Sequence, residues 1–261
     1  MFAHPIQSWG KNQGLTPYLS SVIGLGVVDS TNKYANALLD SKMLDETAIV
    51  ADFQTSGRGQ FHNVWWSPAG ENLLFSLVWL RSKCSIENQF NLSVAVAVAL
   101  KRCLNTSFGL HAQIKWPNDI YVNGQKLAGI LIENSLQGKE IKASILGIGL
   151  NVNTEVFPAE LARAISLRQL LGEEINREEL FFSLLNTLHA VYIQVQTGQI
   201  QKLWEEYESV LFRKDELAAY EWAGRRVNGI IRGVQPSGLL QFECNNEIHS
   251  VNLKEIKYCA E

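Results

Sequence analysis

The dipeptide Asn123-Gly124 separates two apolar stretches and fixes how the chain on either side of it can pair. Asn-Gly is favoured in a two-residue type I′ turn, because both positions of that turn have a positive φ angle. The sequence therefore predicts a hairpin over residues 114–132. Its expected register pairs Val122 with Gln125, Tyr121 with Lys126 and Asp119 with Ala128. Alternation would place Asp119, Tyr121, Lys126 and Ala128 on one face, so the Asp119 carboxylate and the Lys126 amine could share a site.

Apolar periodicity and helix-start signals predict strands and helices on both sides of this hairpin. The run from Val94 to Leu100 is apolar on every side, which indicates a helix packed in the centre of the molecule. Strands are expected at residues 22–28, 47–53, 72–80 and 145–152. Helices are expected to start at Asp29-Ser30-Thr31, to run from Ser85 to Leu104, and to cover residues 167–171, 177–195 with Asn176 as the cap, and 200–212.

The chain changes character after Phe212, where short apolar stretches alternate with glycine, Pro-Ser-Gly and Asn-Asn turns. About fifty residues with four or five short strands predict a small β-barrel. A length of 261 residues is consistent with a main domain plus an appended module. We therefore expect a main domain over residues 1–212 and a small barrel over residues 213–261.

Composition limits the classes of partner. A formal charge of −3 and a pI near 6.0 argue against a general nucleic-acid binder, because neutralising many phosphates normally needs a basic excess. The first fourteen residues do not resemble a signal peptide, and no stretch approaches the ~18 apolar residues of a membrane helix. We expect a cytoplasmic protein with no membrane partner. Reduced, structural thiols are expected at the four widely spaced cysteines, Cys84, Cys103, Cys244 and Cys259.

A polar loop around Arg58 carries the first chemical signal. Arg58 lies between two glycines, which let the backbone approach a ligand while the guanidinium offers paired donors to carboxylate or phosphate oxygens. A solvated loop arginine is the alternative. Trp65 and Trp66 favour a site, because adjacent tryptophans need an apolar partner and could form a lid or a pocket wall. They could also anchor the foot of a strand, or the two rings could point in opposite directions. A basic loop closed by aromatic rings suits the activation of a carboxylate as an acyl-phosphate.

The predicted hairpin carries a second set of candidate ligand groups. Lys126 follows the turn, and the apolar strand after it could hold the stem of the lysine in place; an exposed turn lysine is the alternative. Asn118 and Asp119 follow Trp116-Pro117, as at a ligand-facing edge, although Asn-Asp is also common in plain turns.

A third set lies in the predicted strand at residues 145–152. Gly147 and Gly149 thin this strand, and Asn151 has an amide suited to adenine or ribose; glycines packed under a helix are the alternative. Two well-known phosphate motifs are absent, since there is no G-x-x-x-x-G-K-[ST] loop and Gly147-Ile148-Gly149 lacks the third glycine of a dinucleotide fingerprint. The histidines lack serine or cysteine partners in a nucleophile motif, so acyl-enzyme catalysis is not expected.

Taken together, these motifs resemble the biotin protein ligases. The resemblance runs from about residue 27 to the C-terminus. It rests on five motifs in order: Asp29-Ser30-Thr31-Asn32, the G-R-G…W-S-P…N-L loop over 57–73, K-W-P-N-D at 115–119, K-L-A-G-I-L at 126–131 and G-I-G-L-N-V-N at 147–153. The family has an α+β fold, in which a mixed β-sheet flanked by helices is joined to a C-terminal Src-homology-3-like β-barrel. Its catalytic domain is related to class II aminoacyl-tRNA synthetases and lipoate ligases.

The resemblance implies a two-step reaction. Biotin attacks the α-phosphate of MgATP to give biotinyl-5′-AMP, and a lysine of a biotin carboxyl carrier protein, from acetyl-CoA carboxylase or a related carboxylase, then takes the biotinyl group. The catalytic residues would be Lys126 and Arg58. Biotin would contact Ser30, Thr31, Gln54, Gly57, Arg58, Lys126 and Gly129. The adenylate would contact Arg58, Gln60, Trp65, Asn118, Asp119, Lys126 and Asn151, which would face the adenosine. Asp119 would either touch magnesium or only orient Lys126, and a homodimer stays open.

Two rival functions share parts of this pattern. A lipoate-protein ligase has the same fold and chemistry, but its usual arginine–serine–glycine-rich loop is missing here while K-W-P-N-D is present. A non-catalytic biotin sensor or repressor would need a DNA-binding element. Only about twenty residues precede the first predicted strand, where some relatives carry a helix-turn-helix domain of about sixty. The sequence therefore predicts a monofunctional ligase without operator binding.

One departure from the family concerns the loop. The most familiar bacterial ligases carry second and third loop arginines where this chain has Gln60 and Asn63, and a glycine where it has His62. We hypothesise that retention of the adenylate depends more heavily on Arg58 and Lys126 alone.

Replacing Gln60 by arginine tests this hypothesis. We expect Gln60→Arg to slow the release of biotinyl-5′-AMP, because a second guanidinium would hold the phosphate. The dissociation rate of the adenylate from wild type and variant measures the effect, and an unchanged rate would contradict the hypothesis.

Overall fold

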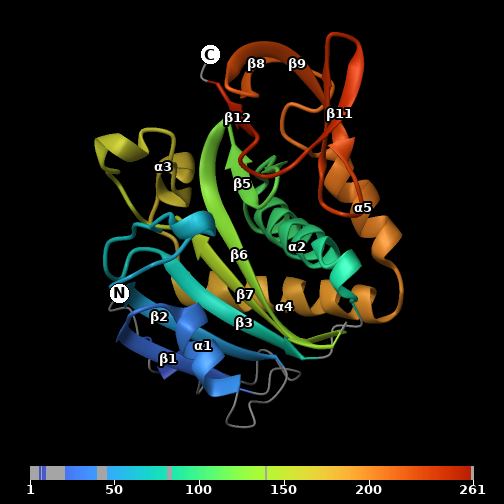
Figure 1. The fold of residues 1–261 in the computed structure, drawn as a ribbon. Coiled ribbons are helices and arrows are strands. Elements are labelled where there is room, and N and C mark those ends of the chain that lie inside the picture. The colour runs from blue at the N-terminus through green and yellow to red at the C-terminus, as the bar shows by residue number, and fades with distance from the viewer. Residues whose placement is uncertain are drawn as a thin grey trace.

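A mixed sheet forms the centre of the protein (Figure 1). The computed structural model describes Ile6, Ser8, Trp9 and residues 21–39, 46–80, 84–138 and 140–259, so the start of the chain considered for a signal peptide lies mostly outside it. Within these residues seven strands lie in the order β1-β2-β3-β7-β6-β5-β4. They are β1 (Ser21–Val28), β2 (Thr47–Gln54), β3 (Leu73–Leu80), β4 (Gln113–Lys115), β5 (Asp119–Val122), β6 (Gln125–Gln137) and β7 (Glu140–Leu150). Only β1 and β2 pair in parallel, which confirms the predicted mixed sheet.

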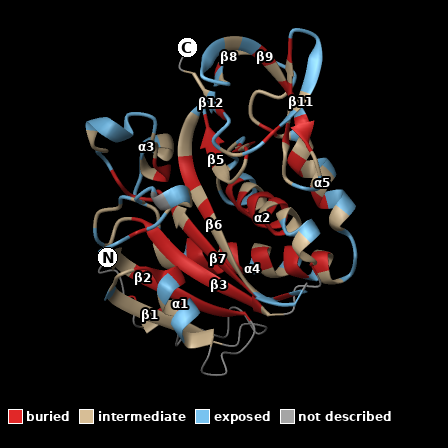
Figure 2. Ribbon diagram, in the orientation of Figure 1, coloured by how far each residue is buried: buried red, intermediate tan, exposed pale blue. Residues whose placement is uncertain are grey.

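Helices cover both faces of this sheet. Helix α1 (Thr31–Leu39) packs Ala35 on one face against Ile49, Val78 and Ile145. Alternate residues of the same strands, such as Val50 and Phe75, point to the opposite face and join the main core with α2 (Phe90–Phe108) and α4 (Arg177–Gln196). Figure 2 shows the buried residues running through the strands and through α2. The sheet is therefore a central layer with an apolar core on each side.

The predicted central helix is confirmed, but its ends differ. Every residue from Val94 to Leu100 is fully buried. Ser85 does not start this helix; it precedes a short 3-10 helix, Ile86–Asn88, and makes no capping hydrogen bond. Helix α2 begins at Phe90 and continues to Phe108, where Gly109 takes a left-handed conformation with φ 65°. A glycine after the last helical residue commonly marks the end of a helix, and the predicted end at Leu104 did not take Gly109 into account.

The remaining helices lie close to their predicted positions. Helix α3 (Leu167–Leu171) agrees with the prediction, and Asn176 caps α4 by accepting from the backbone N–H groups of Glu178 and Glu179. Helix α5 covers Ile200–Ser209 and so ends before the predicted residue 212. One further 3-10 helix is Ala159–Leu161. No helix in the described part of the chain is long and apolar enough to span a membrane.

The predicted register of the hairpin is confirmed next to the Asn123-Gly124 turn, but it is wrong farther from the turn. Both turn residues have positive φ angles, 52° and 75°, and Val122 pairs with Gln125 and Tyr121 with Lys126. A bulge between Ile120 and Tyr121 then shifts the register, so Asp119 faces Gly129 instead of Ala128. Ala128 consequently points into the core and not to the side of Lys126. The bulge adds one residue on β6, and no short-range signal predicted it.

A second, antiparallel sheet follows α5. Its five strands are β8 (Leu217–Trp222), β9 (Arg225–Val234), β10 (Leu240–Cys244), β11 (Glu247–Val251) and β12 (Ile256–Tyr258), in the order β11-β10-β9-β8-β12. This sheet is consistent with the small barrel expected from the sequence. Trp116, between β4 and β5, donates a hydrogen bond of 2.9 Å from its indole nitrogen to the carbonyl of Gly238 and so links the two sheets. The expected boundary at residues 212 and 213 lies between α5 and β8 and stays a prediction.

The buried face of α4 supplies a stability prediction with a control on the same helix. Leu188 is fully buried, whereas Ile193 is 46% exposed. We expect Leu188→Ala to lower the free energy of unfolding by about 2–5 kcal/mol, because it leaves a cavity in the core. Ile193→Ala should change it by no more than about 0.5 kcal/mol. Urea denaturation of both variants checks this, and equal losses would contradict the assigned helix faces.

Candidate active site

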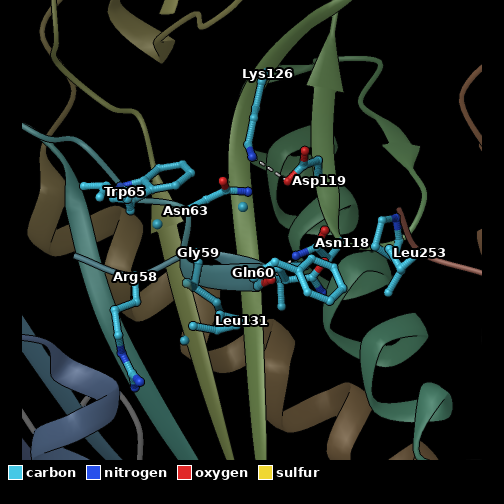
Figure 3. Close-up of a pocket in the computed structure, with 18 of the residues that line it drawn as sticks. Arg58, Gly59, Gln60, Asn63, Trp65, Asn118, Asp119, Lys126, Leu131 and Leu253 are labelled. Atoms are coloured by element: carbon cyan, nitrogen blue, oxygen red, sulfur yellow. Dashed lines mark hydrogen bonds and ion pairs between the residues drawn. The ribbon is translucent and has the colours of Figure 1, made fainter. Parts of the chain in front are cut away.

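A cavity of about 410 Å³ opens on the face of the sheet that carries α1 (Figure 3). Its lining comes from the start of α1, the end of β2 at Gln54, the loop from Arg58 to Trp65, the turn between β4 and β5, strands β6 and β7, and the last turn and strand of the second sheet. Of the charged residues that line it, Arg58, Lys115, Lys126, Lys254 and Lys257 are basic and Asp119 is acidic. The cavity is therefore suited to an anionic ligand.

Lys126 and Asp119 form an ion pair inside this cavity. The Lys126 Nζ atom lies 2.7 Å from a carboxylate oxygen of Asp119, and their side chains are 33% and 19% exposed. The Lys126 ammonium is also 5.4 Å from the centre of the Trp65 ring. Gly129, which faces Asp119 across the strands, leaves room for both, since a Cβ atom there would lie 2.8 Å from the Trp65 ring and 3.4 Å from Lys126 Nζ. The sequence prediction that Lys126 and Asp119 share a site is confirmed in the structure.

The two tryptophans of the loop point in different directions. Trp65 lines the cavity and lies over Gly149, where a Cβ atom would be 2.4 Å from its ring. Trp66 lies outside the cavity, 37% exposed, with its ring centre 6.1 Å from that of Phe157. Trp65 is therefore the wall of the cavity, and Gly149 is needed because any side chain would displace it.

Arg58 reaches the cavity wall, but its guanidinium is engaged elsewhere. The group forms an ion pair of 2.7 Å with Glu133 on β6, and the two side chains are 43% and 36% exposed. Figure 3 shows the Arg58 side chain extending away from Lys126. The two cations line one cavity, but the Arg58 guanidinium points to Glu133 and not to the Lys126 ammonium.

A buried hydrogen-bond network joins Glu133 to the start of α1. The Asn32 amide nitrogen donates to Glu133 over 2.8 Å, and the Asn32 amide oxygen accepts from the Ser76 hydroxyl over 2.6 Å. The Ser76 hydroxyl also lies 2.8 Å from the Thr31 hydroxyl. Gln54 completes the network, because its side-chain oxygen accepts from the Thr31 backbone N–H over 2.7 Å.

Gly147 makes this network possible. A Cβ atom on Gly147 would lie 2.3 Å from the Asn32 side-chain oxygen, so only glycine lets Asn32 approach the sheet. Gly147 pairs with Ser76 on β3 and with Leu131 on β6, which places the network at the centre of the sheet. Gly147 agrees with the alternative of a glycine packed under a helix, since Asn32 is in the first turn of α1, whereas the space that Gly149 makes for Trp65 was not predicted.

Lys115 lies between aromatic rings at the border of the two sheets. Its Nζ atom donates to the Tyr121 hydroxyl over 3.0 Å and lies 4.6 Å from the centre of the Tyr258 ring. Burial lowers the pKa of Lys115 to about 8, the Asp119 carboxylate opposes this shift, and nearby cations, first Lys126, add to it. Lys115 is part of the K-W-P-N-D motif, but no role was predicted for it.

Most of the residues predicted for the site do line the cavity. Those that do are Ser30, Thr31, Gln54, Arg58, Gln60, Trp65, Asn118, Asp119, Lys126 and Gly129. The Asn118 amide nitrogen donates to the Ile130 carbonyl, and the Ile130 N–H donates to the Asn118 carbonyl over 2.9 Å.

Two predicted residues lie outside the lining. Gly57 forms the base of the loop, where a Cβ atom would be 2.4 Å from the Trp65 carbonyl oxygen. Asn151 is buried, and its amide nitrogen donates to the carbonyls of Ile165 over 3.1 Å and Lys126 over 3.4 Å. These hydrogen bonds fix the chain around Lys126, and the contact of Asn151 with an adenosine stays a prediction. The side chain of His62 lies outside the description.

The described residues do not form a metal cage. No group of three or more histidine, cysteine, aspartate or glutamate side chains within them could hold an ion. Asp119 is the one carboxylate in the cavity lining, and it is paired with Lys126. A magnesium ion fits here only as one carried by nucleotide phosphates, since Mg²⁺ is commonly held by one or two carboxylates plus the phosphates.

Comparisons with known proteins agree with this geometry. The family model described as "Biotin/lipoate A/B protein ligase family" matches residues 24–151. The bifunctional ligase/repressor BirA of Bacillus subtilis is 33% identical over 241 residues, which cover 88% of this chain and 72% of that protein. The biotin--[acetyl-CoA-carboxylase] ligase of Paracoccus denitrificans is 32% identical over 224 residues, covering 83% and 91%.

A solved structure shows the same fold. The biotin protein ligase from Aquifex aeolicus, in complex with biotin and ATP, superposes with a TM-score of 0.77 at 25% identity and covers 91% of this chain and 99% of that one. This chain belongs to the biotin/lipoate A/B protein ligase family, and its named relatives above are biotin ligases. The predicted α+β fold and the predicted family are confirmed.

The lowered pKa of Lys115 predicts how stability changes with pH. In the unfolded chain the amine keeps its proton up to its ordinary pKa of 10.5, but in the folded protein only up to about 8. Between these values the unfolded chain binds more protons, so the contribution of Lys115 to stability rises with pH. We expect the free energy of unfolding of wild type, relative to Lys115→Met, to increase between about pH 7.5 and about pH 9.5. Parallel pH profiles from urea denaturation would contradict the burial of a charged amine.

Proposed function

We propose that this protein is an ATP-dependent biotin ligase, which activates biotin as biotinyl-5′-AMP and transfers it to a lysine of a biotin carboxyl carrier protein. The observation that carries the proposal is the Lys126–Asp119 ion pair of 2.7 Å, which lies in the same cavity as the Thr31–Gln54 polar group. The relatives named above support biotin as the substrate and give no support to lipoate.

The polar end of the cavity suits the ureido ring of biotin. Gln54 turns its side-chain oxygen toward the Thr31 N–H, which leaves its amide nitrogen as the donor for a ligand carbonyl. Ser30 and Thr31 are both 3% exposed and add hydroxyl groups at the same end of the cavity. A bicyclic urea needs both a donor and an acceptor, and this end of the cavity offers both. A carboxylate at the far end of the ligand would then point toward Lys126.

The opposite end of the cavity suits the reacting phosphate. Adenylation brings a carboxylate to a triphosphate, and the two anions repel each other unless a cation lies between them. Lys126 would neutralise the carboxylate and the α-phosphate in both steps, because Asp119 and the neighbouring Trp65 ring already hold its ammonium in place. Magnesium, arriving with ATP, would neutralise charge on the phosphates, and Asp119 is the residue that would contact it.

Arg58 would join the site only after ligand binding. Its pair with Glu133 is partly exposed, and surface pairs contribute about 0–1 kcal/mol, so a phosphate can compete for the guanidinium. Glu133 would stay in place, because Asn32 also donates to it. The loop that lies across the cavity would then hinder water from hydrolysing the mixed anhydride.

Other features of the proposal concern the partners. The carrier lysine must reach the adenylate through the cavity mouth, so a carrier protein is the proposed macromolecular partner. We propose no nucleic-acid partner, since the chain has a net charge of −3. We also propose that the protein acts in the cytoplasm, and a homodimer stays open.

Biotin-dependent exchange of pyrophosphate into ATP tests the function. We expect exchange with biotin and none with lipoate, and we expect Lys126→Ala to lower the rate by about 10²–10³, the loss typical of one preorganised donor. Lys142→Ala, which removes an exposed lysine from β7, is the charge-matched control and should keep the wild-type rate. Exchange with lipoate alone, or an unaffected Lys126→Ala variant, would rule out the proposed enzyme.

A further inference from the structure

The tip of the active-site loop touches the second sheet. The Lys254 Nζ atom lies 4.0 Å from the centre of the Phe61 ring. Phe61 is in the 3-10 turn Gln60–His62 at the tip of the loop, and Lys254 is in the turn between β11 and β12. Both residues also line the cavity. A cation–π contact therefore joins the loop to the second sheet at the cavity mouth.

Both partners have an unusual backbone conformation. Phe61 has a φ angle of 55° and Lys254 one of 74°, in the left-handed region that a residue with a Cβ atom rarely adopts. Such conformations persist where the surroundings hold them. The Asn252–Glu255 turn supplies this support for Lys254, because its ends are joined by hydrogen bonds of 2.7 and 3.2 Å. Phe61 is 48% exposed, and the Lys254 ammonium lies over its ring.

The base of the loop is fixed independently of its tip. Trp65 donates from its backbone N–H to the carbonyl of Gly57 over 3.0 Å, and Gly59 donates to Asn63 over 2.7 Å. The Trp65 ring covers Gly149 on β7. The loop is thus a short hairpin with its base on the first sheet and its tip on the second. Figure 3 shows Trp65 and Leu253, the neighbour of Lys254 in the chain, on opposite sides of the view.

We propose that Phe61 and Lys254 are positioning residues that latch the loop across the cavity and so slow the escape of the adenylate. The inference rests on the proposed function, because it assigns the latch to retention of biotinyl-5′-AMP. Neither residue has to touch the reacting atoms. The ring and the ammonium act together, so removing either one frees the tip while the base stays on Trp65. Direct binding of a phosphate by Lys254 would instead need no ring at position 61.

A double-mutant cycle tests the latch in the full-length protein. Lys254→Met keeps the stem and removes the charge, and Phe61→Leu keeps an apolar side chain and removes the ring. We expect each to speed the loss of preformed labelled biotinyl-5′-AMP, chased with unlabelled adenylate, by about two- to fivefold, as for an exposed cation–π contact. The double variant should lose it no faster than either single one. Lys254→Arg and Phe61→Tyr should restore retention, and Lys142→Met should match wild type.

Amide hydrogen exchange of residues 57–65 without any ligand gives a second readout, which does not depend on catalysis. Exchange should be faster in both single variants if the latch exists. Unchanged exchange, independent effects that multiply in the double variant, or an effect of Lys254→Met alone would each overturn the latch. If wild type forms no adenylate, the proposed function fails, and the hydrogen-exchange comparison still decides whether the two residues hold the loop.

Discussion

The site depends on glycines in the two strands whose surface lines the cavity. Gly147 and Gly149 on β7, with Gly129 on β6, form a bare surface onto which Asn32, Trp65 and Lys126 pack. A Cβ atom at any of these glycines would lie within 2.3 to 2.8 Å of Asn32 or Trp65. Contacts of that kind require one partner to move. The glycines therefore decide where the polar network and the aromatic wall can sit, and the position of the cavity follows from them.

Signals that act within a few residues predicted parts of the fold correctly. Features that depend on packing between distant residues were not predicted. The Asn123-Gly124 turn specified two residue pairs of the hairpin, and the apolar run at Val94–Leu100 specified a central helix. Both signals act within a few residues, where turn chemistry and periodicity dominate. The bulge at Ile120 was missed because its cause is packing: Leu127 and Ala128 are both fully buried, and a regular strand would turn one of them outward.

The same distinction applies to the site. Lys126 and Asp119 could be brought together from sequence because a single turn separates them. Arg58 and Glu133 are 75 residues apart, and the sequence offered no reason to pair them. Asn151 shows a role that was not predicted, since its amide nitrogen donates to two backbone carbonyls beside the site. A polar residue in a motif can serve the chain that holds the site as well as the ligand.

The charge of the whole chain and the charge of the cavity have opposite signs. The protein carries a net charge of −3, yet the charged residues of the cavity lining comprise five basic side chains and one acidic one. The basic groups come from the loop, β4, β6 and the second sheet, and no single segment is basic enough to mark an anion site. Burial is the main cause of the lowered pKa of Lys115, and repulsion from nearby cations, first Lys126, adds to it. An anion that enters the cavity offsets this repulsion, so ligand binding should stabilise the folded protein.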